Sequence, residues 1–394
     1  MLVGRPLETL DPMPSADRAR TLALGAIVAS AAAIATGLSL GLPLLALVLQ
    51  ARGVSATWIG LNSAIAGLAS ILAPPLVTPL ARLLGATRLL IASLALVAVS
   101  FFAFHLVESL AGWFVLRILF HGALTIAFVV SEFWLVSLAP PDKRGLLVGV
   151  YATVFSVGLA LGPVVLAFTG SAGPLPFVVG AAILATAVVP AWVARGARPD
   201  LHQASEHSTI GFVLAAPAAT VGVFAFGAVE SGGLSILPLW GLGQGLDEAR
   251  AAWLLTTVGL GNVVLQIPLG LLADRLDKNR LLVLASLGGA LGAALLPFVA
   301  ESLPLMLALL FFWGGTAAGL YTFGLAMLGD RYHGSDLAGA NAAFVSMYGL
   351  GMLVGPAAIG VGLDAAPSLG APLVMAAFFA LHLALLALLA RRHP

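Results

Sequence analysis

The segments GLALGP (residues 158–163) and GMLVGP (residues 351–356) share the pattern Gly-x-x-x-Gly-Pro and lie 193 residues apart. The same offset places Arg82-Leu83 over Arg275-Leu276, and no gap is needed between the two matches. Because 193 is close to half of the 394-residue chain, one offset relates two distant motifs across the whole sequence. The sequence therefore predicts an internal repeat of two similar halves.

The composition places these halves in a membrane. Hydrophobic residues make up 60% of the chain and charged residues only 9%, whereas charged residues are about a quarter of an average soluble domain. One bilayer crossing takes about 20 apolar residues, so the length suits twelve spanning helices with short loops. The predicted spans are 21–50, 57–81, 88–107, 111–138, 145–169, 174–194, 209–238, 249–273, 280–300, 303–328, 337–363 and 371–390.

The longest polar interruption lies close to the middle of the chain. It reads ARGARPDLHQASEHS, and it predicts a linker at about 195–208 between a first domain, 1–200, and a second domain, 201–394. Lys and Arg residues near the span ends decide orientation. Fifteen of them fall on the side of the chain ends, two on the opposite side, and only Arg117 inside a span. The charges therefore predict an even number of spans with both termini in the cytoplasm.

Several motifs resemble those of the major facilitator superfamily. The segment GLLADRLDKNR (residues 270–280) is similar to the loop motif that this superfamily carries between its second and third helices, here in the second half. The first-half copy keeps Arg82, Gly85 and Arg88, but Ala81 stands at its Asp position. The two Gly-Pro motifs resemble the antiporter-type signature of the superfamily. The resemblance covers essentially the whole chain.

This resemblance implies an all-α membrane protein with the major facilitator fold, in which two six-helix halves are related by a pseudo-twofold axis. It also implies a bacterial inner-membrane location and a monomer. In the loop motif, Asp274 and Arg275 are expected to hold the outward-facing form through bonds across the seam between the halves. Gating residues implied in this way, with close helix packing as the alternative for the Gly-Pro set, are Arg82, Asp274, Arg275, Gly158, Gly162, Pro163, Gly351, Gly355 and Pro356.

Ionisable residues inside a span are costly, by roughly 2.5–3.5 kcal/mol each on the insertion scale, and are functional candidates for that reason. Arg117 and His121 are four residues apart on the fourth span, and Glu132 lies eleven residues beyond His121. At 3.6 residues per turn the three side chains form one polar stripe, which could line a path through the bundle. Glu230 is a further candidate in the seventh span, where the glycines around it suggest an irregular helix beside a cavity. The alternative for each is a structural polar anchor.

Other polar residues could line a cavity or make bonds between helices. They are Asn262 and Gln266 in the eighth span, Tyr321 and Thr322 in the tenth, and Trp134 in the fourth, for which packing is the favoured interpretation. His105 and His382 are expected to be interfacial and peripheral. No cysteine is present, which excludes disulfides and thiolate chemistry, and no metal site or cofactor is expected.

These features favour a proton-coupled secondary transporter of a small organic solute over an enzyme. Protons, the solute and the lipid bilayer are the expected partners, and nucleic acid is not. The Gly-Pro signature leans towards antiport and efflux, with proton-coupled uptake as a close alternative. A copper carrier is less favoured because no Met or His lies between Gly211 and Arg275. A sensor on a transporter fold stays open. No nucleophile elbow, metalloprotease motif or P-loop is present.

Overall fold

The computed structural model describes residues 15–138, 140, 144–193, 213–332 and 334–392, and its regular elements in these ranges are helices. The first group, here called the N-terminal half (15–193), contains α1 Ser15–Ala51, α2 Ala56–Leu72, α3 Pro74–Leu84, α4 Ala86–Leu106, α5 Leu110–Leu138, α6 Arg144–Thr169, α7 Leu175–Thr186 and α8 Val188–Val193. The second, the C-terminal half (217–392), contains α10 Pro217–Gly243, α11 Glu248–Arg275, α12 Lys278–Leu295, η2 Leu296–Val299, α13 Leu303–Arg331, α14 Gly334–Ala365 and α15 Gly370–Arg392. The predicted linker at 195–208 lies outside the described residues.

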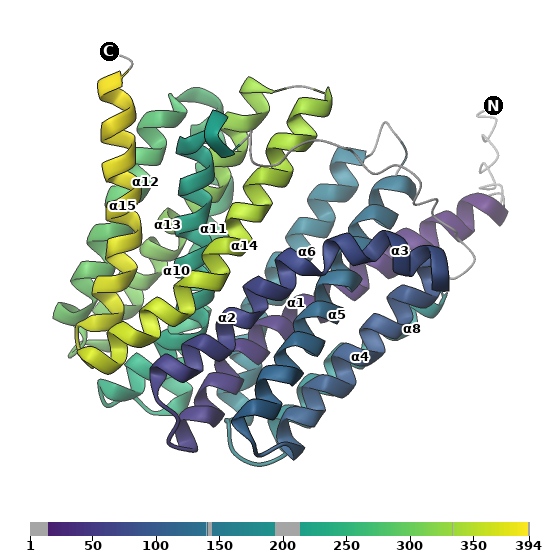
Figure 1. The fold of residues 1–394 in the computed structure, drawn as a ribbon, viewed down its shortest axis with the longest axis horizontal. Helices are drawn as coiled ribbons and strands as arrows, with labels where there is room; N and C mark the ends of the chain where they lie inside the picture. The colour runs from purple at the N-terminus through teal and green to yellow at the C-terminus, as the bar shows by residue number, and fades with distance from the viewer. Residues whose placement is uncertain (1–14, 139, 141–143, 194–212, 333, 393–394) are drawn as a thin grey trace, which may run out of the picture.

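The helices are long and apolar enough to make this a multi-pass membrane protein. Ten helical segments in the described part of the chain could each cross a bilayer, one of them made of α7 and α8 together, and the pair α2 and α3 would make an eleventh span. In α6 the apolar stretch Thr153–Thr169 is shorter. Each of the twelve predicted spans coincides with one helix or with two consecutive helices. The start of α1 and the end of α15 lie towards the same side of the molecule, here the termini side, and the opposite side is the far side (Figure 1).

One predicted span is sharply bent in the structure, and another is interrupted by a single non-helical residue. The span expected as 57–81 bends by 60° between α2 and α3, and the span expected as 174–194 is divided between α7 and α8. In the first, Pro74 and Pro75 begin α3, and proline has no N–H to give and clashes with the preceding turn. The sequence contained the prolines, but an uninterrupted apolar run obscured their effect.

The two Gly-Pro motifs make matching contacts in the two halves. Gly158 in α6 packs against Ala35 of α1, and Gly351 in α14 packs against Ala228 of α10. Ala35 and Ala228 are themselves 193 residues apart, so the contacted helix follows the same repeat. A Cβ at any of the four motif glycines would collide with the neighbouring helix. In this conformation the glycines permit close packing inside each half, and their role in gating stays a prediction.

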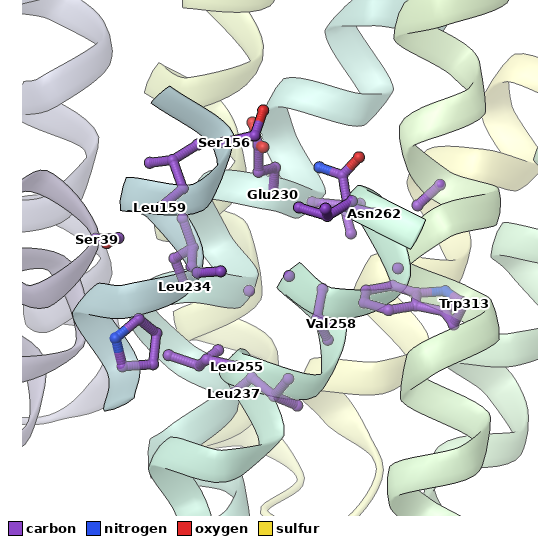
Figure 2. A pocket seen from close by; sticks show the side chains of 18 of the residues that line it. Ser39, Ser156, Leu159, Glu230, Leu234, Leu237, Leu255, Val258, Asn262 and Trp313 are labelled. Atoms are coloured by element: carbon purple, nitrogen blue, oxygen red, sulfur yellow. The ribbon is translucent and has the colours of Figure 1, made fainter. Parts of the chain in front are cut away.

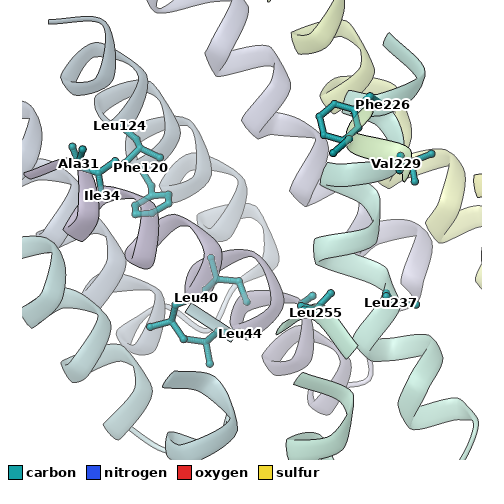
Figure 3. Close-up of a cluster of buried hydrophobic side chains, with 14 of the residues drawn as sticks. Ala31, Ile34, Leu40, Leu44, Phe120, Leu124, Phe226, Val229, Leu237 and Leu255 are labelled. Atoms are coloured by element: carbon teal, nitrogen blue, oxygen red, sulfur yellow. The ribbon is translucent and has the colours of Figure 1, made fainter. Parts of the chain in front are cut away.

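Apolar side chains fill the interior of both halves. Figure 3 shows Ala31 and Ile34 on α1 beside Phe120 and Leu124 on α5, with Val229 and Leu237 on α10 in the other half. The halves meet along two seams, where α2 packs against α14 and α6 packs against α11. Transmembrane helices need small residues at such contacts, and at the first seam Gly60 and Gly67 of α2 lie directly against the backbone of α14.

Candidate functional site

A cavity lies between the two halves, lined by α1, α6, α10, α11 and α13 (Figure 2). It holds about 820 Å³ of space not filled by atoms, part of it open to solvent. Most of its wall is apolar, and the polar groups that reach it include Ser39, Ser156, Glu230 and Asn262. An apolar pocket with a few polar groups is typical of a site for a small molecule.

Glu230 is the acidic residue of this cavity. The hydroxyl of Tyr348 on α14 donates a hydrogen bond of 2.5 Å to its carboxylate. The rings of Phe226 and Tyr321 pack close to Tyr348, with centroids 6.2 Å away from it in each case. The surrounding protein shields this carboxyl from water, and Tyr348 donates a hydrogen bond to it. No basic side chain among the described residues interacts with its charge. The carboxyl is therefore held by a neutral donor inside an aromatic cluster.

The helix that carries Glu230 is not irregular, so that expectation is wrong. Helix α10 is a continuous α-helix from Pro217 to Gly243. Its glycines serve close approach to α14 instead: a Cβ at Gly227 would meet the backbone of Tyr348, and one at Gly232 would meet Ile359. Removing side chains on this face brings the two helices together and places the Tyr348 hydroxyl on Glu230.

The other predicted cavity residues divide between the cavity wall and helix contacts. Asn262 lines the cavity, whereas the Gln266 amide donates to the Thr322 hydroxyl at 2.9 Å and joins α11 to α13. Trp313 lines the cavity, and its indole N–H donates to the carbonyl of Gly289 at 2.9 Å. Trp134 is fully buried in the hydrophobic core and is not part of this cavity wall.

Glu132 on α5 faces the space between the halves. Its side chain is exposed, and it lies within electrostatic range of Tyr151 on α6 and of Tyr321 on α13 in the opposite half. The carboxyl groups of Glu132 and Glu230 both interact electrostatically with the Tyr321 hydroxyl. The structure thus brings the two predicted carboxylates to the same inter-half space, one from each half.

Arg117 and His121 lie away from open space. Both are buried, with 0% and 3% of their surfaces exposed. The Arg117 Nε donates to the Asn62 side-chain oxygen at 2.8 Å, and the guanidinium lies over the ring of Phe104. The predicted polar stripe is therefore sealed at its Arg117 end, because α2 covers it, and exposed at its Glu132 end.

His382 is a structural residue, although it was expected to be peripheral. It is fully buried on α15, with Nδ1 2.8 Å from the Ser286 hydroxyl on α12 and Nε2 2.9 Å from the Ala218 carbonyl on α10. Both ring nitrogens are thus satisfied, and one side chain ties three helices together. His105 lies in the last turn of α4, as expected, and packs on Phe177.

Two contacts that the sequence did not indicate close the far side. The Asp364 carboxylate at the end of α14 accepts hydrogen bonds from the backbone N–H groups of Ala56 and Thr57, at 2.9 and 2.7 Å. These groups begin α2, and a helix N-terminus attracts an anion. The Glu248 carboxylate at the start of α11 accepts from the Ser171 N–H at 3.0 Å.

The two far-side contacts are related by the internal repeat. Ser171 and Asp364 are 193 residues apart, and so are Ser55, which precedes Ala56, and Glu248. Gly170 ends α6 with a positive φ of 66°, a conformation that glycine adopts without a steric cost, and this turn presents the next N–H to Glu248. Both seams are therefore closed at matching places, and both carboxylates come from the C-terminal half.

The loop motif on the termini side makes no such closure. Asp274 and Arg275 are exposed, and within the described ranges neither has a recorded ion pair across the seam; the same holds for Arg82. The motif's Lys278 instead pairs with Asp330 of α13 at 2.5 Å, inside its own half. Its Asp277 accepts the Arg280 N–H at 2.9 Å and caps α12. The expectation that Asp274 latches the outward-facing form stays a prediction.

The sequence pattern of the Major Facilitator Superfamily matches residues 27–251 and 219–394 of the chain. The chain belongs to this superfamily. An uncharacterized superfamily transporter of Bacillus subtilis, YfkF, is 26% identical over 328 residues, which are 81% of this chain and 83% of that protein. Another from Enterobacter, Ent638_1421, is 27% identical over 253 residues, which are 62% of this chain and 63% of that one.

Solved structures of other transporters of this kind share the fold. The nucleoside transporter NupG superposes with a TM-score of 0.77 at 14% identity, over 95% of this chain and 99% of that one. A bacterial homologue of the human lysosomal transporter Spinster, in an inward-facing and occupied conformation, gives a TM-score of 0.74 at 14% identity, over 95% and 97%. The two-half major facilitator architecture predicted from the sequence is confirmed.

Proposed function

We propose that this superfamily member is a proton-coupled secondary transporter that moves a small organic solute through the inter-half cavity by alternating access. In this proposal it lies in a bacterial inner membrane with both termini in the cytoplasm. The fifteen-to-two distribution of Lys and Arg supports that orientation. The closed far side is then the periplasmic side, and the conformation described here faces inward.

One observation carries the coupling proposal: Glu230, half-buried at the cavity wall, has the Tyr348 hydroxyl as its partner and no basic neighbour among the described residues. A carboxyl balanced by a cation is held in its charged form, whereas one held by a neutral hydroxyl can gain or lose a proton at a smaller cost. Solute and proton can then compete for, or share, the same cavity. Glu132, on the opposite wall, is the second proton-binding candidate.

A single titrating carboxyl is energetically sufficient. One proton moving down a potential of about 130 mV supplies roughly 3 kcal/mol, which is about a hundredfold concentration ratio of solute. Antiport is favoured by the Gly-Pro motifs through their resemblance to the antiporter signature. Proton-coupled uptake remains the alternative, and the direction of proton movement distinguishes the two.

The test uses the full-length protein in liposomes that contain a trapped fluorescent pH dye. Candidate solutes come from comparing the exported metabolites and toxin sensitivities of a deletion strain with those of its parent, and nucleosides join the panel because a nucleoside transporter shares the fold. We expect one solute class to drive saturable proton movement, outward or inward according to the coupling mode. Solute flux with no proton movement would remove the coupling, and no flux for any active solute would favour a sensor.

A further inference from the structure

A cluster of buried polar groups in the N-terminal half has more donors than acceptors. Among the described residues, the Arg117 Nη1 and the Asn62 side-chain nitrogen have no hydrogen-bond partner, and the His121 ring has no side-chain partner and only the Arg117 backbone, one turn earlier, within reach. All three residues are at most 3% exposed. Buried polar groups in folded proteins are nearly always satisfied by protein, water or a bound group, so an unpaired set of this size is a candidate for binding a polar ligand.

The charge balance of the cluster points in the same direction. A guanidinium stays protonated in proteins, and a buried charge normally has an opposite charge beside it. No carboxylate among the described residues acts on Arg117, whose recorded polar side-chain partners are Asn62 and Ser63, at 2.8 and 3.5 Å. The one charged group that acts on His121 is Arg117 itself. The cluster thus carries a positive charge without a counter-charge.

We propose that Arg117, His121 and Asn62 form a binding site for the anionic group of a small solute, a carboxylate or a phosphate. A guanidinium presents its N–H groups in a fork that matches either oxyanion. The Asn62 oxygen accepts from Arg117, which leaves the amide nitrogen as a further donor. A single water molecule supplies two lone pairs and no charge, whereas an oxyanion supplies both the acceptors and the charge that the cluster lacks.

The position of the cluster links it to the far-side opening. Helix α2 presents Gly60 to the backbone of α14 and Asn62 to Arg117, so the helix that closes the seam also carries one of the donors. Along α5, His121 lies one turn after Arg117, and Glu132 farther along the same stripe faces the opposite half. The anion site is sealed while the far side is closed. Its role in transport rests on the proposed function, but anion binding itself does not.

The test measures anion binding to the full-length protein in detergent, without any transport. Sodium acetate, phosphate and chloride are titrated at constant ionic strength, and thermal unfolding is followed. Binding to the folded state should raise the melting temperature along a saturable curve. The order of the three apparent affinities shows whether a carboxylate, a phosphate or a halide is preferred.

Variants assign the binding to the cluster. Arg117→Gln should weaken the saturable shift at least tenfold, and His121→Phe, which keeps a buried ring, about threefold or more. Arg250→Gln removes an exposed arginine of the other half and should leave the affinity unchanged. If Arg117→Gln does not give folded protein, His121→Phe decides.

No saturable shift with any of the three anions, or a shift that survives these cluster variants, would overturn the site. Anion binding without solute flux would keep the site and reject the transport proposal. Flux without anion binding would do the reverse.

Discussion

The two halves of this transporter share one fold but differ in what they contribute to the seam and the cavity. In the C-terminal half, the half-buried Glu230 accepts a hydrogen bond from the Tyr348 hydroxyl. In the N-terminal half, the buried Arg117 keeps an unpaired nitrogen, and the His121 ring has no side-chain partner among the described residues. The same asymmetry appears on the far side, where Asp364 and Glu248 supply carboxylates and the N-terminal half supplies backbone N–H groups. A repeated fold thus fixes where groups lie and leaves their chemistry free to diverge.

Glu132 is the exception, because it is an acid on the N-terminal side of the cavity. It is exposed, while Glu230 is half-buried and hydrogen-bonded. If this difference in environment matters, the loss of Glu132 and the loss of Glu230 should lower proton-driven flux by different amounts.

The largest effect is expected from Glu230→Gln. The amide keeps the shape of the side chain but cannot exchange a proton, so proton-driven flux should fall by about thirtyfold or more while solute exchange without a gradient persists. Flux is measured in liposomes with and without a pH gradient. The same change at Glu132 should lower proton-driven flux less.

Glu301→Gln supplies the matched control, because Glu301 is an exposed acid in the far-side turn between η2 and α13. Equal losses at Glu132 and Glu230 would break the distinction between the halves. Full proton-driven flux in both variants would reject the proton role of either carboxyl.

A smaller but still large effect is expected from Gly60→Ala at the seam. The new Cβ would collide with the Pro356 carbonyl of α14, and overpacking of this kind costs about 1–3 kcal/mol. The fraction of molecules with an open far side should then rise about fivefold or more. The chain has no cysteine, so a Leu255→Cys variant offers one buried, cavity-lining target for an impermeant maleimide added on the far side.

Gly122→Ala is the control for this substitution, since nothing lies within 4 Å of a Cβ built there. Unchanged labelling in Gly60→Ala would mean that the α2–α14 contact does not limit far-side opening. Increased labelling in Gly122→Ala as well would show that the assay reports general loosening.

The helical framework was predictable because its signals are local or repeated. Apolar runs of about 20 residues gave the spans, and the offset of 193 residues predicted the repeat that the matching contacts of Gly158 and Gly351 follow. The site was predictable only in part. Glu230 stood out as a charge in an apolar run, but Tyr348 is 118 residues away, and no pattern in the sequence pairs them. Folding brings such partners together through helix packing that the local sequence does not encode.

The errors have a similar cause. Glycines around Glu230 suggested an irregular helix, yet in α10 they are used for close approach to α14. His382 was expected at the periphery because its span is an outer one, but its neighbours on α10 and α12 bury it. In each case the residue type was read correctly as unusual, and the choice between its possible uses depended on a partner distant in the sequence.

An intermediate effect is expected from Tyr348→Phe. The substitution keeps the ring that packs on Phe226 and removes the hydroxyl that donates to Glu230. Since a hydrogen bond to a charged group contributes about 1.5–3 kcal/mol, we expect proton-driven flux to fall at least threefold with a changed pH dependence. In the N-terminal half, the Tyr151 hydroxyl has no hydrogen-bond partner among the described residues, so Tyr151→Phe should have little effect. Equal behaviour of the two variants would argue against the Glu230 contact.

The smallest effects are expected at the far-side carboxylates. Asp364→Asn weakens two hydrogen bonds to the start of α2, and Glu248→Gln weakens one to Ser171. Interactions of an anion with an exposed helix N-terminus contribute about 0.3–1 kcal/mol, so far-side labelling of Leu255→Cys should rise about two- to fivefold for Asp364→Asn and less for Glu248→Gln.

Asp247→Asn separates closure from local capping. Asp247 accepts the Arg250 N–H at 2.7 Å within its own helix terminus, and its loss should leave labelling unchanged. If both seams open in one concerted step, the double variant of Asp364 and Glu248 should show the sum of the two free-energy changes, because the contacts share no residue and stabilise the same closed state. If each seam opens separately, the two increases in labelling rate should add instead, and the double variant should label more slowly than the summed free energies require.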